Sequence, residues 1–234
     1  MNRRQLFAAG AVLPLIPAVA RADDAADRRL REDWAWLGRY AEENAALKAR
    51  GAKTGIVFMG DSITQGWREK RPDFFREGRV GRGISGQTTP QMLVRMMADV
   101  IALRPRAVHI MAGTNDIAGN TGPMTRQQSF DNLAAMATLA RANRIGVILA
   151  SVPPASSFPW RPGLETIGPI AEINRWIAGY VRETRAIHVD YGPALTDGRG
   201  GIPKALAYDG VHPTPEGYAA MERVLSPILA KRGL

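Results

Sequence analysis

The sequence contains no cysteine among its 234 residues. It therefore forms no disulfide, offers no thiolate nucleophile and builds no cysteine-ligated metal site. Histidine is scarce as well, since only His109, His188 and His212 are present. No apolar run reaches the roughly 18 residues that a membrane-spanning helix needs, so we expect no stable membrane insertion.

Basic residues exceed acidic ones, with 31 Lys and Arg against 22 Asp and Glu, but they are scattered along the chain. Nucleic-acid binding is typically marked by a basic stripe interleaved with aromatic side chains, and the sequence has no such stripe. A composition of 45% hydrophobic and 23% charged residues is ordinary for a globular protein. We therefore expect a solvated basic surface, no nucleic-acid partner and a single domain with a sizeable core.

The first 22 residues differ in pattern from the rest of the chain. Arg3 and Arg4 precede a short apolar run from Leu6 to Ala20 that ends in small residues, which is typical of an export signal. The adjacent arginines resemble a twin-arginine signal, and an ordinary secretory signal is the alternative. The sequence therefore predicts a signal over residues 1–22, one domain over residues 23–234, and a periplasmic or secreted protein.

An apolar stripe with helical spacing predicts a helix over about residues 30–49 at the start of this domain. Its members are Leu30, Trp34, Leu37, Ala41 and Ala45. Gly51 ends the predicted helix. We interpret the stripe as a packing face rather than as a binding site.

From residue 54 onwards, short apolar runs alternate with amphipathic stretches. The runs cover residues 55–59, 107–111, 147–150 and 187–190, with a weaker one near residues 80–84. The amphipathic stretches predict helices near residues 90–103, 125–143, 169–185 and 215–231. Because such runs are typical of parallel strands covered on both faces, we expect an α/β fold, a single doubly wound three-layer α/β/α domain with a mostly parallel five-stranded sheet. Right-handed crossovers then place the carboxyl ends of the strands on one edge, where such folds bind ligands.

Polar residues directly follow two of these runs. Ser62 lies in residues 60–64, where a serine hydroxyl can be exposed at the start of a helix; capping of that helix is its alternative role. Asn115 lies in residues 113–116, where its amide can donate a hydrogen bond to a developing oxyanion. A turn in which the Asn-Asp pair bonds its own backbone is the alternative here.

Histidine is well suited to take a proton from a serine near neutral pH, provided that a carboxylate orients it. His212 follows Asp209 by three residues in a tight turn, so the two side chains can hydrogen-bond locally. His109 lies inside a predicted buried strand, which favours a structural role. His188 shares a strand face with Asp190, but two ligands without a third make a poor metal site. We therefore expect no metal, and we expect His212 to be the base in a Ser, Asp, His order along the chain.

Four segments resemble the sequence blocks of the SGNH (GDSL-type) hydrolase superfamily, namely residues 60–64, 83–86, 113–116 and 209–213. Each is a weak signal alone, whereas all four in order are specific, and the resemblance extends over about residues 54–230. It implies a flavodoxin-like fold with Ser62 as nucleophile, His212 as general base and Asp209 orienting it. It also implies an oxyanion hole made by the backbone N–H groups of Ser62 and Gly86 and by the side chain of Asn115. We expect no cofactor.

The residues after Ser62, Ile-Thr-Gln-Gly-Trp, are similar to those of bacterial acetylhydrolase-type esterases, although Gly81 stands where many of these have asparagine. We therefore expect hydrolysis of short-chain acyl esters, acetyl esters first, on small-molecule or carbohydrate substrates. The alternatives are a broad short-chain aryl or lipid esterase and a catalytically inactive carbohydrate-binding relative. The candidate substrate-binding residues, for which loop packing is the alternative role, are Trp67, Ile117, Phe158 and Trp160.

Residues 81–86 also match the Gly-x-Gly-x-x-Gly pattern of dinucleotide-binding folds. That motif requires a strand before the glycines and a helix that opens within them, and residues 76–80 are a poor strand. The Gly-x-Ser-x-Gly elbow of α/β-hydrolases is absent, because Gln87 occupies the last position of the near match over residues 83–87. We therefore expect neither a nicotinamide cofactor nor an α/β-hydrolase fold.

Overall fold

The computed structural model describes residues 28–234 of the chain. It divides into two compact units, one that ends at Trp34 and one over Ala35–Leu234. In the first unit, residues 28–32 form a short helix. The export signal expected over residues 1–22 lies outside the described residues and stays a prediction. Between residues 28 and 234, no helix has both the length and the apolar composition needed to cross a membrane.

The continuous helix expected over residues 30–49 is wrong. Trp36 adopts a left-handed conformation with φ of 55°, and only after it do the short helix η1 (Leu37–Tyr40) and the helix α2 (Ala41–Ala49) form. The expected apolar packing face is wrong as well, because Leu37 is 42% exposed and the buried residue of α2 is the polar Asn44.

The five strands form one sheet in the order β2-β1-β3-β4-β5, and every pair of neighbours is parallel. The strands are β1 (Ile56–Gly60), β2 (Arg79–Gly83), β3 (Ala107–Met111), β4 (Gly146–Ala150) and β5 (Ile187–Val189). The predicted α/β fold class is thus confirmed, and the sheet is parallel throughout rather than mostly so. The glycine pattern over residues 81–86 begins inside β2 instead of following it, so it lacks the layout of a dinucleotide-binding turn.

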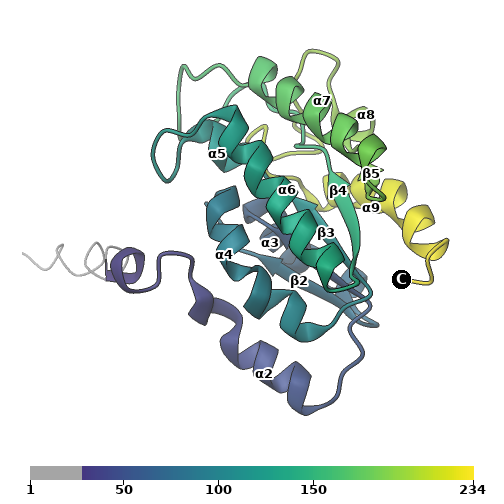
Figure 1. The fold of residues 1–234 in the computed structure, drawn as a ribbon. Coiled ribbons are helices and arrows are strands. Elements are labelled where there is room, and N and C mark those ends of the chain that lie inside the picture. Colours follow the sequence, from purple (N-terminus) through teal and green to yellow (C-terminus); the bar gives the residue numbers. More distant parts are fainter. Residues whose placement is uncertain (1–27) are drawn as a thin grey trace, which may run out of the picture. The chain divides into compact units, whose positions relative to one another are not determined.

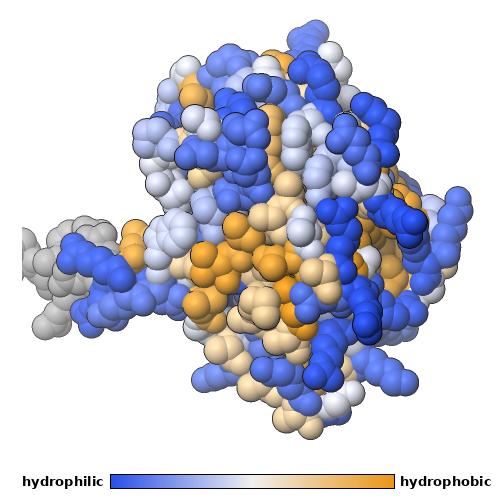
Figure 2. Space-filling model, viewed as in Figure 1, coloured by the Kyte–Doolittle hydropathy of each residue, from blue (hydrophilic) through white to orange (hydrophobic). Residues whose placement is uncertain are grey.

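Helices cover both faces of the sheet, as the doubly wound prediction requires (Figure 1). One face carries the neighbouring helices α4 (Thr89–Asp99), α6 (Arg126–Ala142) and α7 (Ile167–Glu183). The other carries α3 (Ser62–Lys70), which contacts α9 (Pro215–Ala230). The remaining short helices are η2 (Pro72–Phe75), η3 (Ile101–Leu103), α5 (Thr114–Ala118) and α8 (Gly192–Leu195). Figure 2 shows apolar side chains gathered on the outer side of α4, where Val94 and Met97 are exposed.

An aromatic cluster fills the space between the sheet and the α3 face. The Trp67 ring of α3 stacks on Phe74 at 5.1 Å and on Tyr218 of α9 at 5.9 Å, and meets Phe58 of β1 edge-on. His109 of β3 lies in the same cluster, fully buried, with its Nε2 2.9 Å from the Tyr191 hydroxyl. This placement agrees with the structural role expected for His109.

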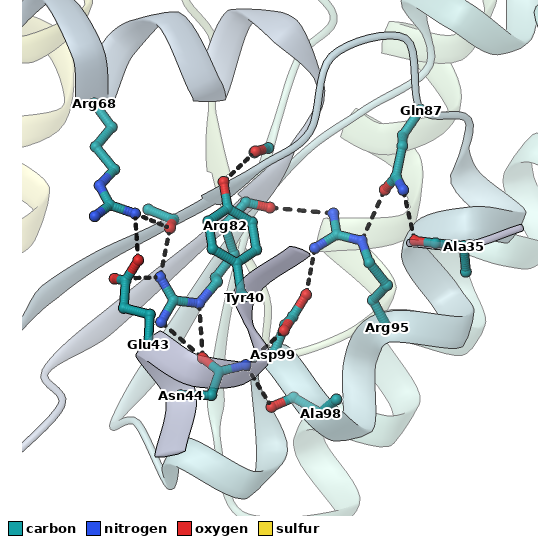
Figure 3. A network of polar contacts seen from close by, with 12 residues as sticks. Ala35, Tyr40, Glu43, Asn44, Arg68, Arg82, Gln87, Arg95, Ala98 and Asp99 are labelled. Carbon is teal, nitrogen blue, oxygen red and sulfur yellow. Dashed lines mark hydrogen bonds and ion pairs between the residues drawn. The ribbon is translucent and has the colours of Figure 1, made fainter. Parts of the chain in front are cut away.

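A buried polar network attaches α2 to the edge of the sheet (Figure 3), together with the partly buried Leu47, which packs against the core. Asn44 of α2 accepts from the guanidinium of Arg82 at 2.7 and 2.9 Å and donates to Asp99 at 2.7 Å. Asp99 also pairs with Arg95 on α4, and both arginine side chains are fully buried. Buried charges are costly unless they are paired and hydrogen-bonded, and here each has such partners. These bonds and Leu47 therefore attach α2, and the predicted apolar stripe does not.

We predict a pH-dependent contribution of His109 to stability. Burial lowers the pKa of His109 to about 3, whereas an unfolded histidine has a pKa of about 6.5. Below pH 6.5 the unfolded chain therefore binds a proton that the folded protein does not, so the contribution of neutral His109 is complete above that pH and is lost as the pH falls toward 3. Relative to His109→Phe, the wild type should lose up to about 1.4 kcal/mol of unfolding free energy per pH unit in this window.

Urea titrations of both proteins between pH 8 and pH 4 measure this difference. Loss of the bond to Tyr191 in the variant adds an offset that does not depend on pH. Parallel stability curves for the two proteins across the window would contradict the assignment.

Candidate active site

Ser62 is the first residue of α3 and directly follows β1 and Asp61. The Asp61 carboxylate accepts a hydrogen bond from the Ile63 N–H at 2.9 Å, so Asp61 caps the helix and the Ser62 hydroxyl does not. The first N–H groups of a helix have no intrahelical acceptor and carry its positive dipole end. The Ser62 N–H is therefore placed to donate to an anion beside its own hydroxyl. Close approach of β2 supports this turn, since a Cβ on Gly83 would lie 2.2 Å from the Gln65 nitrogen.

His212 reaches Ser62 from a tight turn before α9. Its Nε2 lies 2.9 Å from Ser62 Oγ, and its Nδ1 lies 2.7 Å from Asp209 Oδ2. The other carboxylate oxygen of Asp209 accepts the backbone N–H groups of Val211 and His212 at 3.0 and 2.8 Å. Gly210 allows this turn through its left-handed φ of 82°. The structure thus brings together the three side chains that the sequence predicted as a triad.

The hydrogen bonds from Ser62 to His212 and from His212 to Asp209 form a relay, and in it the Asp209 carboxylate is held in its charged form. Partial burial alone would raise the pKa of Asp209, but hydrogen bonds from the His212 backbone and ring and from the Val211 N–H outweigh it and lower the pKa. A carboxylate that stays ionised fixes the imidazole tautomer with the proton on Nδ1 and leaves Nε2 free to accept from the serine.

Asn115 lies on α5, directly after β3, and faces the same edge as Ser62. Its Nδ2 donates to the Gln87 carbonyl at 3.0 Å and lies 3.5 Å from Asp61 Oδ2, so the amide does not bond its own backbone as the alternative supposed. Gly86 lies in the loop between β2 and α4 with a left-handed φ of 77°. β1 and β3, the strands before Ser62 and Asn115, are neighbours where the strand order reverses, which is where folds of this kind bind ligands.

Several supporting residues were not singled out from the sequence. Asp116 is buried, accepts from Thr89 N at 3.0 Å and Ser129 Oγ at 3.1 Å, and so ties α5 to α4 and α6. The Tyr218 hydroxyl donates to the Ile63 carbonyl at 2.8 Å and holds α9 against the start of α3. The sequence signals a role for Asp116 only through its position beside Asn115. It gives no signal for Tyr218, because the contact of Tyr218 with Ile63 joins segments far apart in the sequence.

The four predicted substrate-binding residues separate into different environments. Trp67 is 0% exposed and donates its indole N–H to Glu222 at 3.1 Å, so the prediction that it binds substrate is wrong. Ile117 and Phe158 are also buried. Trp160 is 37% exposed, stacks on Phe158 at 5.1 Å and has its ring centre 5.8 Å from that of His212. Of these four residues, only Trp160 therefore offers an exposed aromatic surface beside the triad.

A cavity of about 260 Å³ opens beside Ser62 and His212. Its other lining residues are Gln65, Gly66, Glu69, Lys70, Ser85, Pro213 and Tyr218. A larger cavity of about 810 Å³ lies at the amino ends of the strands, near Ile56 and Arg106, and contains none of the triad.

The described part of the chain holds no group of three His, Cys, Asp or Glu side chains that could bind a metal ion. His188 Nε2 lies 2.9 Å from Ser151 Oγ, while Asp190 accepts the N–H of Gly192 at 2.9 Å. Both of these side chains therefore have local partners of their own.

Comparison with known proteins assigns the chain to a protein family. Residues 58–220 match the model of the GDSL-like lipase/acylhydrolase family. The chain belongs to this family. Its members are carboxylic ester hydrolases, so the expected reaction class is supported at that level. The predicted resemblance to SGNH (GDSL-type) hydrolases is confirmed.

Individual relatives agree with the family assignment. The chain is 29% identical to esterase TesA of Pseudomonas aeruginosa over 199 residues, which cover 78% of this chain and 89% of that protein. A GDSL-like lipase from Bacteroides thetaiotaomicron is 43% identical, with a TM-score of 0.80 over 86% of this chain and 100% of that one. An acetylxylan esterase from Geobacillus stearothermophilus, a catalytic mutant, has a TM-score of 0.58 over 75% of this chain and 95% of that one, and at 23% identity it shows a shared fold only.

We predict that Trp67→Phe lowers stability without changing substrate affinity. The indole fills the space between Phe74 and Tyr218, so the smaller ring leaves a void and loses the bond to Glu222. The cost should be a part of the about 3–5 kcal/mol that truncation to alanine causes in a core. Chemical unfolding and ester kinetics measure the two effects. A raised KM with unchanged stability would restore Trp67 to the substrate site.

Proposed function

We propose that this protein is a serine esterase that cleaves short-chain acyl esters, acetyl esters first, through an acyl-Ser62 intermediate. The observation that carries the proposal is the continuous relay from Ser62 Oγ to His212 Nε2 at 2.9 Å and from His212 Nδ1 to Asp209 at 2.7 Å. A serine hydroxyl becomes an effective nucleophile when such a base takes its proton. The relay opens into the cavity beside Ser62, where an ester can enter.

The reaction follows from these contacts. His212 Nε2 accepts the Ser62 proton as Oγ forms a bond to the ester carbonyl carbon. The resulting imidazolium is stabilised by Asp209 and gives its proton to the departing alcohol oxygen. Water then enters, and His212 takes a proton from it as the water oxygen bonds to the acyl-Ser62 carbonyl carbon. His212 returns this proton to Ser62 Oγ as the bond from Oγ to the acyl carbon breaks, which releases the acid and restores the serine.

The negative oxygen that forms in each addition step needs donors in fixed positions. The Ser62 N–H at the start of α3, the Gly86 N–H and the Asn115 amide are the three donors of the proposed oxyanion hole. Hydrogen bonds of fixed geometry stabilise charge that develops in the transition state more than they stabilise the uncharged ester. They therefore raise the rate of acylation and deacylation rather than the affinity for substrate.

The cavity favours a small acyl group and a polar alcohol. At about 260 Å³ it is smaller than the roughly 300–1,000 Å³ typical of drug-sized ligands. Polar groups around it come from Gln65, Glu69 and Lys70, and its lining residues form no long apolar groove. Trp160 adds an exposed aromatic ring beside His212, a surface that can stack on the apolar face of a sugar.

We predict that Asn115→Ala lowers kcat by about 10²–10³ with little change in KM, the usual effect of removing one oxyanion-hole donor. Ser62→Ala should lose all ester turnover and all covalent labelling by an organophosphonate, and serves as the control. Steady-state kinetics on p-nitrophenyl acetate and intact-mass measurement check both. Near-wild-type turnover of Asn115→Ala would remove this side chain from the hole, and retained turnover of Ser62→Ala would refute the proposed nucleophile.

We predict that acetyl is the preferred acyl group. On p-nitrophenyl esters of rising chain length, kcat/KM should be highest for acetate and fall for longer acyl chains, and acetylated sugars should release acetate. Trp160→Ala should reduce turnover of the acetylated sugars more than that of p-nitrophenyl acetate, because the sugar loses its stacking surface. A preference for octanoyl and longer esters would contradict the short-acyl proposal, and equal losses on both substrates would contradict the role of Trp160.

A further inference from the structure

We infer that Asn120 is a positioning residue of the oxyanion hole, because its one side-chain amide holds two of the three donors at once. Asn120 Nδ2 donates to Asn115 Oδ1 at 2.8 Å and to the Gly86 carbonyl at 3.2 Å. A primary amide has two N–H groups, and both are used in these bonds. This role rests on the proposed ester hydrolysis and adds to it a residue that lies outside the triad and the hole.

Local structure places the Asn120 amide between its two acceptors. α5 ends at Ala118, and the next residue, Gly119, takes a left-handed φ of 68° that turns the chain. The Asn120 backbone N–H then donates to the Asn115 carbonyl at 3.1 Å. Thr121 anchors the same turn to the start of α4, with its hydroxyl 3.0 Å from that of Thr88.

The first consequence concerns the orientation of the Asn115 amide. A side-chain amide can present either its oxygen or its NH2 group to a site, and only the NH2 group can stabilise an oxyanion. Asn120 donates to Asn115 Oδ1, so the Nδ2 group must turn the other way, toward the Gln87 carbonyl and Asp61, the residue before Ser62. If Asn115 were flipped, its NH2 group would face that of Asn120 and its oxygen would face the Gln87 carbonyl.

The second consequence concerns Gly86. Glycine moves readily between left-handed and other conformations, so the direction of its N–H needs an outside constraint. The bond from Asn120 to the Gly86 carbonyl fixes the peptide plane that follows this residue, and so restrains the left-handed turn at Gly86, whose φ is 77°. Asn120 therefore couples the loop after β2 to the helix after β3, and the two donors keep a fixed separation.

Asn120→Asp tests this role with a side chain of almost the same size. The carboxylate cannot donate, and it places negative oxygens against the Gly86 carbonyl and Asn115 Oδ1. We expect kcat to fall about ten- to a hundredfold, less than the about 10²–10³ for outright loss of a donor, with KM nearly unchanged. The binding of a boronic acid that mimics the tetrahedral adduct should weaken by a similar factor, while the thermal midpoint stays close to that of the wild type.

Two further variants separate positioning from a general effect on the turn. Thr121→Val removes the bond to Thr88 without touching Asn115 or Gly86, and we expect a much smaller loss of kcat than for Asn120→Asp. Asn120→Ala removes the amide without adding charge, and we expect a smaller loss of kcat than for the aspartate. In an Asn115→Ala background, Asn120→Asp should lower kcat by a clearly smaller factor than in the wild type. The effects of two substitutions are not additive when one residue acts through the other.

Unchanged kcat in Asn120→Asp, a raised KM with unchanged kcat, equal losses in Thr121→Val, or additive effects with Asn115→Ala would each overturn the inference. If the wild type itself neither turns over esters nor labels at Ser62, the proposed function fails and the positioning role fails with it. Active wild-type enzyme with fully active Asn120→Asp refutes the positioning role alone.

Discussion

The hydrogen bond between Ser62 Oγ and His212 Nε2 joins groups 150 residues apart in the chain. It is 2.9 Å long, and small displacements at either end would break it. Ser62 is fixed by the end of β1 and by the Asp61 cap of α3, and His212 by the bonds that Asp209 makes within its own turn. Tyr218 lies on α9, the helix that follows His212, and its hydroxyl donates to the carbonyl of Ile63, the residue after Ser62. This bond connects the two segments that carry Ser62 and His212. The Ser62–His212 hydrogen bond thus depends on the packing of α9 against α3.

The opposite side of the site is held by polar contacts. Gln87, whose carbonyl accepts from Asn115, uses its side chain to accept from Arg95 Nε at 2.7 Å and to donate to the Ala35 carbonyl at 2.7 Å. Arg95 belongs to the buried network that attaches α2 (Figure 3). The loop that carries Gly86 is therefore bonded on one side to α2 and α4 through this network and on the other to α5 through Asn120. Hydrogen bonds impose direction, which apolar packing does not, and an oxyanion hole needs donors of fixed direction.

Much of the fold could be predicted from the sequence, because its signals are local. Apolar runs such as residues 107–111 mark buried parallel strands, and polar residues at their carboxyl ends must meet at one edge. Asp209 and His212 form their pair within one turn, so this part of the site follows from spacing alone.

The errors arise where distant segments decide the outcome. Trp67 is a candidate substrate-binding residue in the sequence, but Phe74 and Tyr218, the latter remote in sequence, enclose it. The helix over residues 30–49 was expected from an apolar stripe, whereas the left-handed Trp36 interrupts it and Asn44, paired with Arg82 and Asp99, attaches what remains. Asn120 carried no local signal, since its role depends on Gly86 in another loop.

A crystal structure of the protein after reaction with a small organophosphonate tests the central claim most directly. The account predicts phosphorus bonded to Ser62 Oγ, a phosphoryl oxygen within hydrogen-bonding distance of Ser62 N, Gly86 N and Asn115 Nδ2, and His212 still bonded to Asp209. Modification of a different residue, or an adduct on Ser62 whose phosphoryl oxygen points into solvent away from these donors, would contradict it.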